Sequence, residues 1–87
     1  MNNPPRLQIE SGKAVLTGEW TLAAMLPELP RLQARLTAGG LGSFSWDLSA
    51  VDRLDSAAAV LLWRTWNERW PADLIVTETH RRTVERV

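Results

Sequence analysis

Apolar and polar residues alternate in two short runs near the N-terminus. Leu7–Glu10 and Ala14–Gly18 each have the period of two that is typical of a half-buried strand. Ser11-Gly12-Lys13, which lies between them, has the composition of a tight turn. We therefore expect an opening hairpin.

A stripe of apolar residues at helical spacing comes next. It begins after Thr21 and ends at Gly39-Gly40, a helix-terminating signal. Its members are Leu22, Met25, Leu26, Leu29, Leu32 and Leu36. Because Pro27 and Pro30 fall inside the stripe, we expect a distorted first turn and a regular helix from about Pro27.

The second half of the chain repeats the alternation of strand and helix. Ser43–Ser49 and Asp73–Glu78 are expected to be strands, and Ser56–Trp70 is expected to be a long helix stopped by Pro71. The apolar stripe of that helix is Ala59, Leu62, Trp63, Trp66 and Trp70. A last helix opens at Thr79, so the order β-β-α-β-α-β-α predicts an α/β fold with a mostly parallel four-stranded sheet.

Length and composition limit the function classes. The 87 residues predict one domain, and a 45% hydrophobic content is ordinary for a globular chain. Ten basic and ten acidic residues give no net charge, which argues against nucleic acid as a partner. There is no cysteine for thiolate metal sites, and neither an apolar run of signal-peptide length in MNNPPRLQIE nor one of membrane-spanning length elsewhere.

The acidic segment between Asp47 and Ser56 admits two chemical interpretations. Clustered carboxylates at a strand end favour magnesium and phosphoryl transfer, but the segment has no lysine or histidine to support that reaction. Alternatively, Asp55 and Ser56 cap the helix that follows, because short oxygen-bearing side chains accept hydrogen bonds from free amides. Capping leaves Asp47 and Ser49 unexplained, and we expect them to converge on the same edge.

The segment WDLSAVDRLDS resembles the signature of STAS domains, the sulfate transporter and anti-sigma-factor antagonist family. In that signature a strand ends in an aspartate, a polar residue follows two positions later, and a hydrophobic residue in a short loop precedes Asp-Ser or Asp-Thr at a helix start. Those places are filled here by Asp47, Ser49, Leu54, Asp55 and Ser56. The resemblance covers roughly residues 7 to 80 and implies helices packed on one side of the sheet.

Two branches of the family imply different functions. In the regulatory branch, which includes antagonists of anti-sigma factors, the serine at the position of Ser56 accepts phosphate from a partner kinase. The regulatory members usually continue Ser-Gly-Leu, whereas this chain continues Ala57-Ala58-Ala59. The pattern of Trp20 before the first helix and Trp46 before the aspartate instead resembles STAS domains of bacterial ABC systems that move lipids between membranes. In those systems the domain contacts the ATPase.

The resemblance to the lipid-transport branch implies a noncatalytic interaction module without cofactor or metal, at the cytoplasmic face of the inner membrane. Its partners would be an ATPase subunit and a permease, and residues 1–87 would form the N-terminal STAS domain of a longer chain. We expect the contacts at the start and outer face of the second helix. The candidate contact positions are Arg53, Ser56, Ala57, Arg64 and Glu68.

Two further groups of residues bear on partner binding. The basic residues of the last helix suit a membrane-proximal position, and a solvated helix face explains them equally well. They are His80, Arg81, Arg82 and Arg86.

Five tryptophans are more than the interior of so small a domain readily holds, so we expect one of them, Trp70 or Trp20, to be exposed as a partner anchor.

Overall fold

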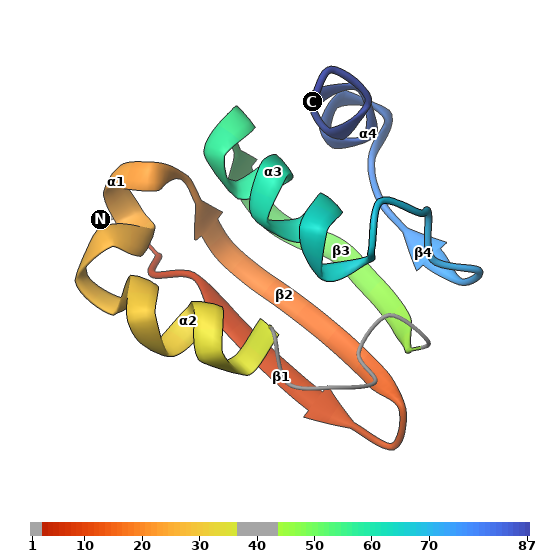
Figure 1. Cartoon of the computed structure of the whole chain (residues 1–87), viewed down its shortest axis with the longest axis horizontal. Helices are drawn as coiled ribbons and strands as arrows, with labels where there is room; N and C mark the ends of the chain where they lie inside the picture. Colours follow the sequence, from red (N-terminus) through yellow and green to blue (C-terminus); the bar gives the residue numbers. More distant parts are fainter. Residues whose placement is uncertain (1–2, 37–43) are drawn as a thin grey trace.

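The computed structural model describes residues 3–36 and 44–87, and Figure 1 shows the arrangement of the elements. The elements are β1 (Arg6–Glu10), β2 (Lys13–Trp20), α1 (Leu22–Met25), the 3-10 turn η1 (Leu26–Glu28), α2 (Leu29–Leu36), β3 (Ser45–Leu54), α3 (Ser56–Thr65), β4 (Leu74–Ile75) and α4 (Glu78–Glu85). The predicted Gly39-Gly40 helix stop lies outside the described residues.

The four strands form one mixed sheet in the order β1-β2-β3-β4. β1 and β2 are antiparallel, whereas β2 with β3 and β3 with β4 are parallel, which confirms the opening hairpin and the mostly parallel α/β sheet. The helical segments α1, η1, α2 and α3 cover one face (Figure 1). α4 lies at the edge of the sheet beside β3, where the His80 Nε2 atom is 3.1 Å from the Val51 carbonyl oxygen.

The core lies between the covered face of the sheet and the helices. Its largest fully buried side chains are Trp20, Trp46, Leu16, Met25, Leu36, Leu48 and Leu62. Trp20 is 0% exposed, so the expectation that it is an exposed anchor is wrong. Trp70 is half-buried against Trp63 and Trp66, with ring centroids at 5.5 and 6.0 Å.

The first helical region is broken as its prolines require. Thr21 caps α1 by accepting a hydrogen bond from the Ala24 amide, and the chain then tightens into η1 with Pro27 in its first turn. Regular helix resumes at Leu29. Leu22 and Leu26, which the apolar stripe placed in the core, are 46% and 56% exposed.

β3 is longer than predicted and contains two irregularities. Its register against β2 shifts between the Val15 and Thr17 pairs and again between the Gly18 and Glu19 pairs, as β-bulges produce. Each shift resets the alternation, so that Trp46 and Leu48 are buried and the next buried residue is Val51. The segment expected to be a loop is therefore strand as far as Leu54.

α3 ends at Thr65, five residues before the predicted end. Its C-terminus is a Schellman motif, because the Glu68 amide donates to the Trp63 carbonyl and the Asn67 amide donates to the Arg64 carbonyl. Asn67 adopts a positive φ of 58°, a conformation that asparagine tolerates better than most residues. The helical spacing of the tryptophans thus continues past the real end of the helix.

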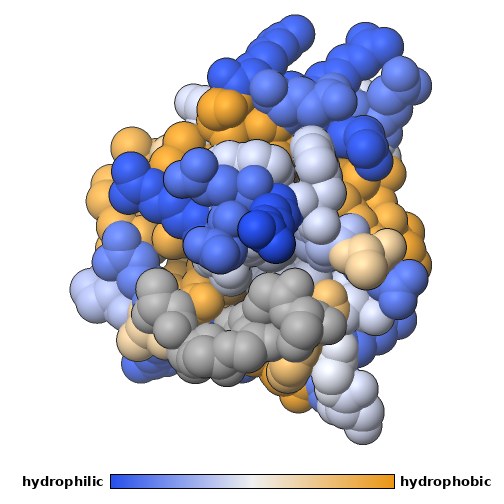
Figure 2. Space-filling view, turned by 45° about the vertical axis from the view of Figure 1, so that its right-hand side comes forward, coloured by the Kyte–Doolittle hydropathy of each residue, from blue (hydrophilic) through white to orange (hydrophobic). Residues whose placement is uncertain are grey.

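The C-terminal elements also differ from prediction. β4 contains only Leu74 and Ile75, because Thr77 is already the N-cap of α4 and Glu78 is its first helical residue. Across the two described ranges, none of the helices has both the length and the apolar character needed to cross a bilayer. Figure 2 shows hydrophilic side chains gathered at the top of the molecule, over α4.

Candidate functional site

Asp55 joins the N-termini of two helices through one carboxylate. Its Oδ1 atom accepts a hydrogen bond from the Ala58 amide at 3.0 Å, which caps α3 as the sequence predicts. Its Oδ2 atom accepts a second bond, from the Leu22 amide of α1 at 2.8 Å. The Asp55 amide donates to the Trp20 carbonyl, so the end of β2 is fixed to the same residue.

Ser56 is the first residue of α3, and its side chain is exposed. Its hydroxyl makes no hydrogen bond with the described residues, and the amides of Ser56 and Ala57 have no acceptor among them. Free amides at a helix start attract anions. The Asp55 carboxylate weakens the attraction for an added anion at this helix start, because it already accepts a hydrogen bond from the Ala58 amide.

An apolar groove separates α1 and α2 from α3, with a volume of about 170 Å³. One wall comes from Leu22, Met25 and Leu29 of the broken helical region. The opposite wall is formed by α3 residues Ala57, Val60, Leu61 and Arg64. Leu22 is 46% exposed and Val60 is 37% exposed, so both walls present large apolar side chains to solvent.

The rim of the groove is polar and carries one uncompensated charge. Arg64 is exposed, and it makes no ion pair with a carboxylate of the described residues. Gln33 lines the rim from the α2 side. Ser56 precedes the wall residue Ala57, so the groove adjoins the free helix start. Apolar walls beside a single guanidinium suit an apolar anchor that has a carboxylate next to it.

Asp47 and Ser49 do not converge on the helix start. Asp47 Oδ1 accepts bonds from the Ser49 amide at 2.9 Å and the Ser49 hydroxyl at 2.6 Å, within the first register shift of β3. These bonds lower the pKa of Asp47, and Lys13 at 3.9 Å lowers it further. Five residues of β3 lie between Ser49 and Asp55, and six steps of extended chain span roughly 20 Å.

The acidic segment is not one pocket. Asp52 accepts a hydrogen bond from the Asn3 side chain, while Asp47 supports the bulge and Asp55 caps two helices. Within residues 3–36 and 44–87, no three His, Asp or Glu side chains are grouped as a metal site requires. The magnesium interpretation therefore has no geometry to support it in that part of the chain.

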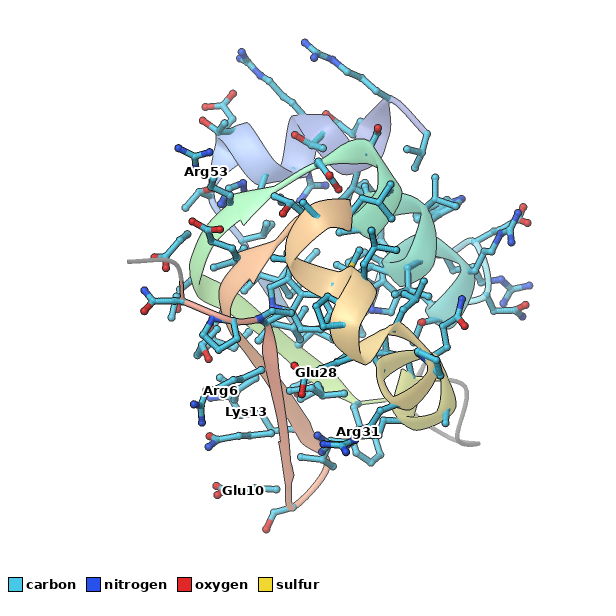
Figure 3. The ribbon with its side chains drawn as sticks, turned by 90° about the vertical axis from the view of Figure 1, so that its left-hand side faces the viewer. Arg6, Glu10, Lys13, Glu28, Arg31 and Arg53 are labelled. Atoms are coloured by element: carbon cyan, nitrogen blue, oxygen red, sulfur yellow. The ribbon has the colours of Figure 1, made fainter. Side chains whose placement is uncertain are left out.

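The candidate contact positions divide between two sides of the molecule. Ala57 and Arg64 line the groove, and Ser56 adjoins it. Arg53 lies on the sheet side, away from α1 and α2 (Figure 3). Glu68 belongs to the left-handed turn after α3, with φ at 59°, and so does not share a helix face with Arg64.

The basic residues of the last helix are largely engaged within the domain. Arg82 pairs with Glu78 at 2.9 Å and Arg81 with Glu85 at 4.0 Å. The Arg81 guanidinium also lies 4.6 Å from the centroid of the Trp70 ring. These contacts are typical of a solvated helix face.

The sequence pattern did not identify three of the groove residues as surface residues. Leu22 was assigned to the core stripe, while Val60 and Leu61 fell outside the expected stripe and were not considered. Pro27 and Pro30 signal a break between α1 and α2, but no local pattern marks Val60 and Leu61 as groove residues.

In comparisons with known proteins, no family model, curated protein or solved structure matches the chain.

Proposed function

We propose that this chain is a noncatalytic interaction module that binds a partner protein in the groove between α1–α2 and α3. The single observation that carries the proposal is the exposure of Leu22 and Val60 on facing walls beside the unpaired Arg64. An apolar anchor from the partner would fill the groove, and an adjacent carboxylate would meet the guanidinium.

The partner we propose is the ATPase subunit of a bacterial ABC lipid transporter, with the associated permease at the cytoplasmic face of the inner membrane. This assignment rests on the resemblance of residues 47–56 to the STAS signature. The strand order and the opening hairpin are consistent with that fold. Asp55 would hold the groove open by fixing the start of α1 to the start of α3.

The test is affinity capture from an extract of the native cell, with partners identified by mass spectrometry. Val60→Glu and Arg64→Glu each place a new carboxylate in the groove. We expect wild type to recover an ABC ATPase and each variant to lose about tenfold or more of it. Arg69→Glu is the matched control, because Arg69 is exposed outside the groove. Equal recovery by all four proteins would exclude this docking surface.

A second function is favoured by one observation, the exposed and unbonded hydroxyl of Ser56. In an anti-sigma-factor antagonist that hydroxyl would accept phosphate from a kinase. Asp55 beside it would repel the added charge and change the binding surface. Incubation with extract and ATP would then add one phosphate to wild type and none to Ser56→Ala, and capture of an anti-sigma factor would replace capture of the ATPase.

A further inference from the structure

A second cleft lies on the other side of α2, between that helix and β1, and has a volume of about 410 Å³. Its charged lining from α2 and η1 is Arg31, Arg35 and Glu28, which sum to one positive charge, and Arg6 adds a second positive charge from β1. Glu28 is 3.8 Å from Arg31, whereas Arg6 and Arg35 make no ion pair with any residue in 3–36 or 44–87. The cleft is therefore cationic although the chain as a whole is neutral.

The floor of this cleft is an open sheet edge. β1 is the first strand in the sheet and, within residues 3–36 and 44–87, pairs only with β2, so its outward amides and carbonyls have no described strand beside them. None of these outward groups bonds to another described residue. The edge runs for five residues after Pro5, which has no amide hydrogen to offer.

Guanidinium groups flank this edge from both sides of the sheet. Figure 3 shows Arg6 on the uncovered side of β1 and Arg31 on the helix side. Arg31 and Arg35 are one helical turn apart, about 6 Å, and alternate side chains of an extended strand are about 7 Å apart. A strand added to β1 would direct alternate side chains toward Arg6 and toward the α2 arginines.

We propose that the outer edge of β1 binds an acidic peptide segment of a partner as an added strand. An extended backbone pairs with the row of edge amides and carbonyls in place of water, and acidic side chains match the cations on either side. This surface is separate from the groove beside α3, and the proposal does not depend on the ATPase or the kinase assignment. A folded nucleic acid or a lipid surface offers no matching backbone.

The test uses fluorescence anisotropy with a short fluorescein-labelled peptide of the repeat Glu-Glu-Val-Val, which places Glu on both faces of an added strand. The same peptide with alternate backbone nitrogens methylated keeps its charge but cannot pair as a strand, and the repeat Lys-Lys-Val-Val reverses the charge. We expect the methylated and basic peptides to bind wild type at least about tenfold more weakly. Hydrogen exchange at the β1 amides should slow only when the unmethylated acidic peptide is bound.

Variants of the protein test the cationic half of the proposal. The double variant Arg31→Glu with Arg35→Glu should weaken the acidic peptide by roughly tenfold or more, because two attractive pairs become repulsive. Arg69→Glu reverses one charge outside the cleft and should bind as wild type does. If wild type bound the methylated and unmethylated acidic peptides equally well, strand addition at this edge would be overturned. It would also be overturned if wild type bound neither peptide and bound only anionic lipid vesicles.

Discussion

Replacing Asp55 by alanine should remove two helix-start hydrogen bonds with one change. Loss of the cap on the Ala58 amide costs about 1 kcal/mol. Loss of the bond from the Leu22 amide costs about another 1 kcal/mol, since that site is exposed enough for water to compensate in part. The expected decrease in the free energy of unfolding is about 2 kcal/mol, or roughly 10 °C in melting temperature for a domain of this size.

Urea unfolding followed by tryptophan fluorescence measures this loss, because Trp46 and Trp66 are buried in the folded protein. Asp55→Asn keeps one acceptor oxygen for the Ala58 amide and should lose about half as much stability. Asp52→Ala removes only an exposed bond from Asn3, so it should cost less than about 0.5 kcal/mol. If Asp55→Ala were no more destabilising than Asp52→Ala, one carboxylate would not be holding both helices.

Three further predictions concern the backbone and pH. Gly18→Ala should destabilise the domain by about 2 kcal/mol or more in urea unfolding, because Gly18 has a φ of 86° and an added Cβ would clash with the Pro4 carbonyl oxygen. Asn67→Gly should raise the unfolding midpoint, by an amount equivalent to a few tenths of a kcal/mol, since glycine adopts the left-handed conformation without steric cost. Because the pKa of Asp47 is lowered from its ordinary value of 3.8, its ionised carboxylate stabilises the fold at pH values above 3.8. Unfolding curves should therefore show the advantage of wild type over Asp47→Asn shrinking as pH falls below that value, and a constant difference would contradict the bonds to Ser49.

The element order could be predicted from the sequence because each strand and helix has its own hydrophobic period. The element ends could not, because backbone hydrogen bonds decide them. In α3 the tryptophans keep helical spacing, yet the chain closes a Schellman motif at Asn67, and Trp70 reaches Trp63 from the following turn. In β3 the buried sequence Trp46, Leu48 and Val51 requires a bulge that simple alternation does not anticipate.

Of the candidate site, the sequence predicts only the contacts between residues close together in the chain. Asp55 as a helix cap follows from residue type and position, and the structure confirms it. The bond from Asp55 to the Leu22 amide is a contact between residues 33 positions apart, which no local pattern contains. The groove depends on Leu22 being exposed rather than buried in the stripe, and the separation of Asp47 from Asp55 depends on β3 continuing to Leu54.

Photo-crosslinking in the native cell tests the proposed docking groove most directly. A photoreactive amino acid at Val60 places the probe in the groove wall, and the same probe at Arg69 controls for random encounters. The account predicts that the ATPase of an ABC lipid transporter is crosslinked from Val60 and not from Arg69, and that Arg64→Glu suppresses the product. An ATPase crosslinked equally from both positions, or an anti-sigma factor captured from Val60 instead, would contradict it.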